Sequence, residues 1–226
     1  MTVRPIIFSV GMARALWEGR KTQTRRVLRE QPVPGHRVAR VLRRPDGEPA
    51  FHAFERRSPH DAYLGDIKVP YATGDLLWVR ETWAGWCGLT YSTDRVVYRA
   101  SSEHIKSPLA GWRPSIHMPR RASRMTLEVT AVRVERVQGI SEADAKAEGV
   151  RWHDWPGCKK CSCDQEDCEW CSHHPAFHVP AFRHLWDSIN GKRPGCAWDD
   201  NPWVVAVSFT HHRQNVDELL RQREAA

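Results

Sequence analysis

The sequence predicts an α+β domain in which a small, partly open β-barrel is flanked by helices. Three observations lead to this fold class. Short segments rich in β-branched residues recur along the chain, as expected of strands. One helix is expected near the start and an amphipathic one directly before the last strand. The 226 residues, 41% of them hydrophobic, suffice for one domain that carries insertions.

The first elements are a strand, a helix and a second strand. We expect a short strand at residues 5–8, and Ser9 is placed to cap a helix that runs through residues 12–17. Gly19 is expected to end this helix in the left-handed conformation. Residues 21–27 alternate polar and β-branched side chains and are expected to leave the helix as a strand.

The middle of the chain predicts an excursion followed by three strands. Residues 29–72 are rich in Arg, Pro and Gly and have weak periodicity, so we expect an irregular basic excursion with one hairpin near residues 45–47. Strands are then expected at residues 76–81, 91–99 and 125–137. The last is the clearest, because its apolar residues mostly alternate and are β-branched.

The last third predicts two helices, a strand and a tail. Ser141 is expected to open a short helix of capping-box type that ends at Gly149. An amphipathic helix is expected over residues 181–190, a buried strand over 202–209 and a charged helical tail over 213–226. One face of the amphipathic helix carries Phe182, Leu185, Trp186 and Ile189.

The eleven tryptophans are expected to have two roles. Four of them lie within expected strands or helices and are assigned to the core: Trp17, Trp78, Trp186 and Trp203. Three others are candidates for stacking on bases: Trp83, Trp86 and Trp112. A tryptophan on a barrel strand is, however, more often a core residue than a stacking platform.

The positive charge is concentrated at the start of the chain. Residues 1–57 hold thirteen Lys or Arg against five Asp or Glu, a net charge of +8, whereas the other 169 residues hold twenty-one against twenty-two. A basic block of this kind favours phosphate-bearing partners such as RNA, a nucleotide or DNA. The alternative is a solvated arginine-rich surface that keeps the protein soluble.

Five of the seven cysteines fall within residues 158–171 and predict a zinc-binding insert. Two Cys-x2-Cys pairs can supply a tetrahedron of thiolates for a structural Zn²⁺. The predicted ligands are Cys158, Cys161, Cys168 and Cys171, with Cys163, His173, His174 and His178 as residues that can replace one of them. The segment is short of aliphatic residues, so its folding is expected to require the metal. The alternative is a set of free surface thiols.

The same cysteine usage indicates a cytoplasmic protein, because an odd, clustered set does not resemble a disulfide framework. The N-terminus lacks the apolar core of a signal peptide, and no apolar run is long enough for a transmembrane helix. We therefore expect no membrane contact. Neither His-x-Glu nor His-Glu-x-x-His occurs, which excludes the zinc deaminase and zincin patterns.

One motif carries a family resemblance. The stretch from Gly19 to Arg26 fits the pattern Gly-x-Lys-x-x-(Glu or Thr)-x-Arg and resembles the opening motif of the ASCH domain, a branch of the PUA-like β-barrel superfamily. The turn at Gly74-Asp75, the helix ending Ala-x-x-Glu-Gly at Gly149 and the closing strand are also similar to that family. The longer pattern resembles a bacteriophage and prophage group and covers about three-quarters of the chain. Its marks are Trp78 to Trp83, Pro114 to Arg120, Leu185 to Asn190 and Asn201 to Val204.

The resemblance implies a domain organisation. Residues 1–151 are expected to form the first part of an ASCH-type barrel, interrupted by the excursion at 29–72. Residues 152–178 are expected to form the zinc insert, residues 179–212 the closing helix and strand, and residues 213–226 the tail.

The resemblance also implies a function, which is recognition of RNA or of a modified nucleoside. Small bacterial ASCH proteins hydrolyse the acetyl amide of N4-acetylcytidine, and their working residues correspond to Lys21, Thr24 and Glu148. In amide hydrolysis Thr24 can supply the nucleophilic hydroxyl, Lys21 can accept its proton or stabilise the oxyanion, and Glu148 can shuttle a proton.

Alternatives to this assignment remain open. Lys21 can simply bind phosphate, Thr24 can be an ordinary strand residue, and Glu148 can be a solvated residue at a helix end. Because Lys21 and Thr24 are three positions apart, they converge only if Lys21 lies in the turn before the strand. Non-catalytic RNA or DNA binding, or a phage accessory role through protein contacts, are the alternative functions. Five further residues are expected to bind substrate or shape its pocket: Arg26, Arg80, Glu81, His117 and Arg120. Of these, Arg80 and Glu81 can form a buried ion pair that fixes the mouth of the barrel.

Overall fold

The computed structural model shows an α+β protein whose chain forms two compact units. It describes residues 1–32, 36–42, 51–56, 63–85, 96–102, 105, 108, 111–151 and 178–225. The first unit comprises Met1–Thr22, Ala72–Ala131 and Ser208–Ala226, and the second comprises Gln23–Tyr71 and Val132–Val207. None of the four helices in the described part of the chain has the length and apolar character that crossing a bilayer requires.

The main sheet is five-stranded and mixed, with the order β1-β6-β9-β10-β2. Its strands are β1 (Val3–Ile7), β2 (Gln23–Val27), β6 (Leu76–Arg80), β9 (Thr126–Arg136) and β10 (Trp203–His212). β1 runs parallel to β6, which runs antiparallel to β9. The α+β class is therefore confirmed, and in this open order β1 and β2 are the outer strands of the described sheet.

Local sequence signals determine where helix α1 (Val10–Trp17) begins and ends. The Ser9 hydroxyl accepts a hydrogen bond from the Met12 N–H, as predicted. Gly19 has φ +80°, which an L side chain adopts only at a cost, so glycine is required at this helix end. The turn leaves Lys21 two residues before β2, outside the regular strand.

A glycine–aspartate turn connects the start of β6 to β1 in the first unit. Gly74 has φ +86°, and the Asp75 carboxylate accepts hydrogen bonds from the backbone N–H groups of Thr2 and Ala72. Asp75 is only 2% exposed, so these bonds compensate its burial. This is the predicted turn, and its aspartate fixes the register of β1 beside β6.

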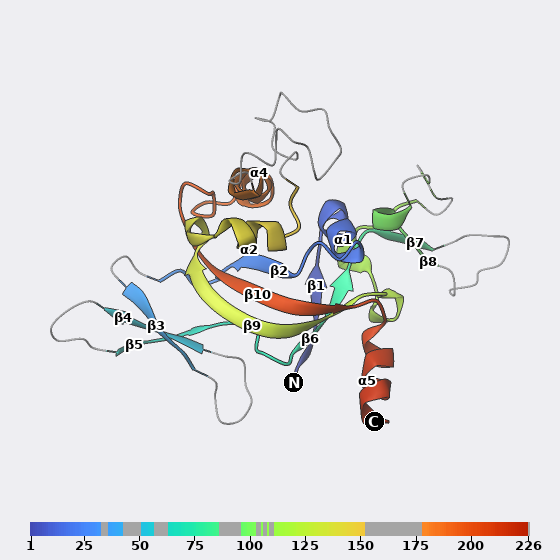
Figure 1. Ribbon diagram of the computed structural model, residues 1–226, viewed down its shortest axis with the longest axis horizontal. Coiled ribbons are helices and arrows are strands. Elements are labelled where there is room, and N and C mark those ends of the chain that lie inside the picture. The colour runs from blue at the N-terminus through green and yellow to red at the C-terminus, as the bar shows by residue number, and fades with distance from the viewer. Residues whose placement is uncertain are drawn as a thin grey trace. The chain divides into compact units, whose positions relative to one another are not determined.

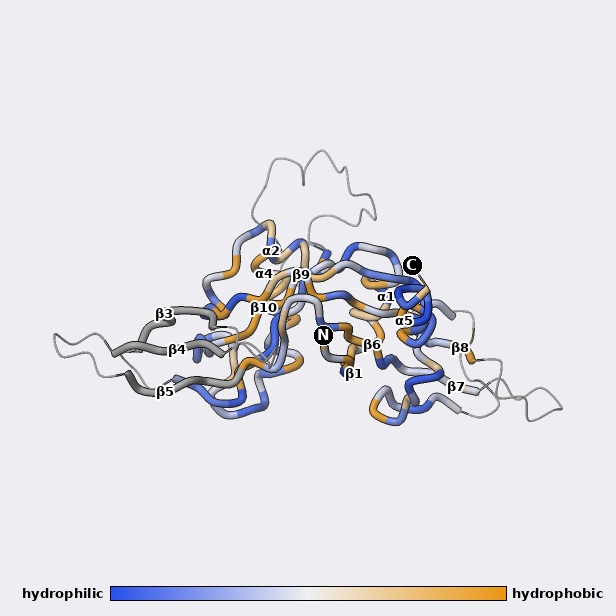
Figure 2. Tube along the Cα trace, turned by 90° about the horizontal axis from the view of Figure 1, so that it is seen from below, coloured by the Kyte–Doolittle hydropathy of each residue, from blue (hydrophilic) through white to orange (hydrophobic). Residues whose placement is uncertain are grey.

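The C-terminal helix α5 (Val216–Glu224) packs on β6 in the first unit. Val216 and Leu219 are buried against Leu76, and Val3, Trp78 and Leu220 surround them. The predicted helical tail is therefore a part of the core. In Figure 2 its trace is mostly hydrophilic, because its apolar residues occupy one face only.

Residues 29–72 contain more regular structure than the sequence predicts. Three antiparallel strands form a separate sheet: β3 (His36–Leu42), β4 (Phe51–Arg56) and β5 (Tyr63–Lys68) (Figure 1). Their register shifts between Val38 and Arg40 and again between Ala53 and Glu55. Such register shifts interrupt the alternation of side chains by which a strand is recognised in a sequence. The prediction of an irregular excursion is therefore wrong for these residues. β3 and β4 pair antiparallel, and the residues near which a hairpin is expected, 45–47, lie outside the described ones.

Strands β7 (Trp83–Gly85) and β8 (Val96–Tyr98) form a two-stranded sheet, with Trp83 opposite Tyr98. β8 lies within the strand predicted at 91–99, but Arg99 already belongs to a 3₁₀ helix, Arg99–Ser101, and residues 91–95 lie outside the described ones. β7 was not predicted, because three residues are too few to show a period.

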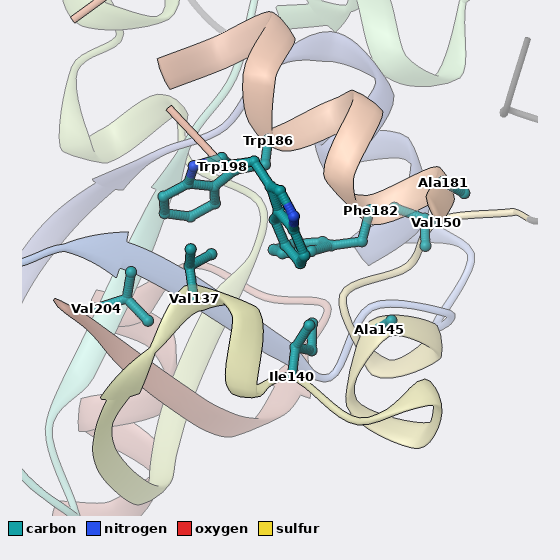
Figure 3. Close-up of a cluster of buried hydrophobic side chains, with 9 residues drawn as sticks. All are labelled: Val137, Ile140, Ala145, Val150, Ala181, Phe182, Trp186, Trp198 and Val204. Atoms are coloured by element: carbon teal, nitrogen blue, oxygen red, sulfur yellow. The ribbon is translucent and has the colours of Figure 1, made fainter. Parts of the chain in front are cut away.

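In the second unit, α2 (Glu142–Ala147) packs against α4 (His178–Asn190) (Figure 1). The hydroxyl of Ser141 accepts the N–H of Asp144, and Gly149 has φ +83°, so both predicted ends of α2 are confirmed. Figure 3 shows Phe182 and Trp186 of α4 pointing toward Val137 and Ile140. The complete buried cluster is Val137, Ile140, Ala145, Val150, Ala181, Phe182, Trp186, Trp198 and Val204.

Two details of α4 refine the prediction. Ile189 is 52% exposed, so it does not continue the buried face as expected. Ile189 lies in the last turn of α4, after the buried residues Phe182 and Trp186. Position 191 requires a glycine, because a Cβ there would lie 2.6 Å from the carbonyl oxygen of Asp187.

Of the four tryptophans assigned to the core, only Trp186 is fully buried. Trp17, Trp78 and Trp203 are half-buried, and each carries an arginine over its ring. Trp83 and Trp112, the described candidates for base stacking, are likewise covered by arginines, at 5.3 Å and 5.9 Å from the ring centroids. Trp86 lies outside the described residues.

The packing of α5 predicts a stability effect. Leu219→Ala removes a side chain that is 6% exposed and is expected to lower the free energy of unfolding by about 2–5 kcal/mol. Chemical denaturation measures this loss. The control is Glu218→Ala on the exposed face of the same helix, for which a change below about 1 kcal/mol is expected. Equal losses for the two variants would show that α5 does not belong to the core.

Candidate functional site

The motif residues predicted to be catalytic are all buried. Lys21 is 2% exposed, Thr24 4% and Glu148 3%. Lys21 belongs to the first unit, where its Nζ lies 5.7 Å from the centroid of the Phe8 ring. Thr24 and Glu148 belong to the second unit, in β2 and at the C-terminal cap of α2. The solvated alternative for Glu148 is therefore wrong.

Arg25, the residue after Thr24, is surrounded by carboxylates. Its side chain is 0% exposed. Its Nε and Nη2 donate to Oε1 of Glu135 at 2.9 and 2.6 Å, and its Nη2 also donates to Oδ2 of Asp144 at 3.2 Å. Its Nη1 donates to Oε1 of Glu148 at 3.1 Å and to Oε1 of Gln23 at 2.5 Å. We call Arg25, Gln23, Glu135, Asp144 and Glu148 the Arg25 cluster.

The Arg25 cluster holds more negative than positive charge. Arg133 pairs with Asp144 at 2.9 Å and lies 3.8 Å from Glu135, at the exposed side of the cluster. Burial disfavours the ionised form of Asp144, but the hydrogen bond and charge of Arg133 and the charge of Arg25 outweigh it, so the pKa of this carboxyl lies below its ordinary value. Three carboxylates thus share two guanidinium groups.

Strand alternation sorts the motif residues onto the two faces of β2. Gln23 and Arg25 share a face, as the hydrogen bond between them requires, and this face contacts Glu148. Thr24 and Arg26 alternate with them and share the opposite face. Because β2 is an outer strand of the described sheet, a ligand at its edge can meet side chains from both faces.

A second buried ion pair lies in the first unit. Glu81, 1% exposed, accepts from Arg124 at 2.9 Å to Oε1 and 3.0 Å to Oε2. The Cζ of Arg124 lies 4.0 Å from the ring centroids of both Trp17 and Tyr98, and its Nη1 donates to the Ser101 hydroxyl. Burial raises the pKa of the Glu81 carboxyl above its ordinary value, although the hydrogen bond and charge of Arg124 oppose this.

The structure therefore corrects the expected pairing of Arg80 with Glu81. Arg80 is the last residue of β6, and its side chain lies over the ring of Trp78, two positions earlier on the same face of the strand, with its Cζ 5.4 Å from the centroid. The partner of Glu81 comes from a distant segment, the stretch that leads into β9.

The other residues predicted to bind substrate lie in different surroundings. Arg120 pairs with Asp217 of α5 at 2.6 Å, and His117 is exposed. Both belong to the first unit together with Arg80 and Glu81, whereas Arg26 belongs to the second unit and is half-buried. Their roles in binding stay predictions.

The predicted zinc ligands Cys158, Cys161, Cys168 and Cys171 lie outside the described residues. Within the described ranges, no group of three or more His, Cys, Asp or Glu side chains is arranged to hold a metal ion. Inside the Arg25 cluster the three carboxylates bind the guanidinium of Arg25.

A groove of about 590 Å³ lies beside α4 in the second unit. None of the described residues that line it is a predicted site residue. The lining residues are Val179, Pro180, Arg183, His184, Asp187 and Trp198.

Sequence reasoning identified Glu148 but missed the rest of the Arg25 cluster. Arg25 occupies a variable position of the motif, and its carboxylate partners lie 110 to 123 residues further along the chain. Only the Ser-x-x-Asp start of α2 carried a local signal, which marked Asp144 as a helix-start residue. Arg124 was missed as a partner of Glu81 for the same reason, since 43 residues separate them.

Comparison of the chain with protein-family models, curated proteins and solved structures gives no match.

The Glu81–Arg124 pair predicts a large stability effect. Arg124→Met leaves a buried carboxylate without its counterion and is expected to cost about 3–5 kcal/mol of unfolding free energy. Arg120→Met is the matched control, because its pair with Asp217 is 39% and 50% exposed and is worth below about 1 kcal/mol. Denaturant titration distinguishes the two variants, and a similar loss in both would contradict the buried role of Arg124.

The opposite pKa shifts of Glu81 and Asp144 predict opposite pH dependences. The raised pKa of Glu81 gives a stabilising contribution that is present below its ordinary value of 4.5 and is lost as the pH rises through the folded-state pKa. The lowered pKa of Asp144 gives a contribution that is present above 3.8 and is lost as the pH falls through the folded-state pKa.

The measurement is unfolding free energy between about pH 3 and pH 7. Relative to wild type, Glu81→Gln should gain stability as the pH rises, and Asp144→Asn should gain it as the pH falls. If the stabilities of both variants relative to wild type changed in the same direction with pH, the assigned directions of the two pKa shifts would be wrong.

Proposed function

We propose that this protein recognises a modified nucleoside or RNA through an ASCH-like domain and hydrolyses the acetyl amide of an N4-acetylcytidine-type substrate. The partly open PUA-like barrel of that family is part of this proposal, as is the structural zinc site at Cys158, Cys161, Cys168 and Cys171. The proposal rests on the opening motif and on the geometry around it.

The observation that carries the proposal is the burial of the motif. Four of the five residues from Lys21 to Arg25 are polar side chains no more than 5% exposed: Lys21, Gln23, Thr24 and Arg25. Glu148, which the resemblance matches to the same site, is 3% exposed and bonded to Arg25. Polar groups are expensive to bury, so their concentration in one short segment supports a functional rather than a solvated role.

Each of the three proposed catalytic residues has a separate role in the hydrolysis. Thr24 Oγ attacks the acetyl carbon, Lys21 accepts the hydroxyl proton or stabilises the oxyanion, and the bond to the cytosine amine breaks as that amine takes up a proton. Glu148 then activates the water that releases acetate from Thr24. Lys21 lies before β2, as this proposal requires, so strand alternation does not assign its side chain to the face opposite Thr24.

The charge distribution supports a phosphate-bearing form of the ligand. The net charge of +8 lies in residues 1–57, which include the motif. Arg26 shares the Thr24 face of β2 and is our candidate for contact with the substrate, with Arg80, Glu81, His117 and Arg120 as further candidates. RNA is thus the expected natural substrate, and the free nucleoside is the smallest compound expected to act as a substrate.

The test is release of acetate from N4-acetylcytidine. Lys21→Ala and Thr24→Ala are expected to lower kcat/KM by about 10²–10⁴-fold, because each removes a group that acts in the transition state. Thr22→Ala is the matched control, since Thr22 is the exposed threonine of the same motif. No turnover by the wild-type protein would overturn the hydrolase proposal.

Recognition without hydrolysis is the alternative, favoured by the same basic segment. It predicts RNA binding whose affinity falls steeply with salt, because binding releases counterions from phosphates. Filter binding at several salt concentrations, together with the absence of acetate release, would establish this alternative.

A further inference from the structure

Within the motif, the side chain of Arg25 contacts Glu148 directly, by a hydrogen bond of 3.1 Å from its Nη1 to Oε1. Its N–H groups contact acceptors from four places in the second unit: Gln23 in β2, Glu135 in β9, Asp144 in α2 and Glu148 at the helix cap. The Phe182 ring of α4 covers the guanidinium at 5.9 Å. Rotation of Arg25 would break several of these bonds at once, so its fork is held in a fixed orientation.

We infer that Arg25 is a positioning residue that holds the Glu148 carboxylate beside β2 for the hydrolysis. This inference rests on the proposed function. Glu148 ends a two-turn helix, and its side chain has several rotamers. The bond from Arg25 Nη1 selects the one that brings Oε1 to the Gln23 and Arg25 face of β2. A substrate at the edge of this outer strand can be reached from that face and from the opposite face, which carries Thr24. A planar guanidinium can hold the Glu148 carboxylate while it also binds Glu135 and Asp144, whereas an ammonium group cannot reach all three carboxylates.

Arg133, at the exposed side of the Arg25 cluster, provides the matched comparison. It also contacts Asp144 and Glu135, and its ion pairs in the described chain do not include Glu148. Its side chain is 49% exposed, so its removal changes the charge of the cluster without releasing Glu148. If the role of the cluster is purely electrostatic, removal of Arg25 and removal of Arg133 should have similar effects on kcat. If Arg25 positions Glu148, the two effects should differ.

The experiment compares kcat and KM for acetate release from N4-acetylcytidine by the wild type and by Arg25→Lys, Arg25→Gln, Arg133→Gln and Glu148→Gln. We expect Arg25→Lys and Arg25→Gln to lower kcat at least tenfold with KM within about twofold. Glu148→Gln should lower kcat similarly, and adding it to Arg25→Gln should cause no further loss, because both act through one carboxylate. Arg133→Gln should retain wild-type kcat.

Several results would overturn the inference, and they are separable. An active wild type with unchanged kcat in Arg25→Lys, or losses in Arg25→Gln and Glu148→Gln that simply multiply, would refute the positioning role alone. Equal losses in Arg133→Gln would replace it with an electrostatic one. An inactive wild type would refute the proposed hydrolysis and with it this role. Arg25→Lys keeps the positive charge, so it remains informative if Arg25→Gln fails to fold.

Discussion

The second unit depends on the neutralisation of one buried charge. A guanidinium that is fully removed from water must find acceptors for its N–H groups and negative charge nearby, because an uncompensated charge would cost several kcal/mol. Arg25 finds them in Gln23, Glu135, Asp144 and Glu148, so β2, β9 and α2 are held in one arrangement. The apolar cluster around Phe182 then covers the guanidinium.

The first unit uses the same physical solution with different neighbours. Arg124 is bonded to buried Glu81 and lies against the rings of Trp17 and Tyr98. Arg80, Arg113 and Arg136 cover further tryptophan rings elsewhere in the chain. Contacts between guanidinium groups and indole rings therefore recur in the described part of the chain.

Sequence reasoning succeeded where structure is determined locally. Ser9, Gly19 and Gly149 act on neighbouring residues, so their roles at helix ends could be predicted from a few positions. The strands of the excursion were missed because register shifts interrupt their period, and the Arg25 cluster was missed because pairing across more than a hundred residues leaves no local pattern. The burial of Lys21 and Glu148 also depends on packing, so the sequence alone could not decide between a buried and a solvated role.

The division of the chain between the two units bears on how the protein folds. The first unit takes three separate stretches of chain and the second takes two, so the chain passes back and forth between them. Neither unit is continuous, and a single cut anywhere between residues 23 and 207 leaves both incomplete. Contacts of long sequence separation must form before either core closes, which favours slow, concerted folding over independent assembly of the parts. Two fragments from such a cut would regain the structure only by associating with each other.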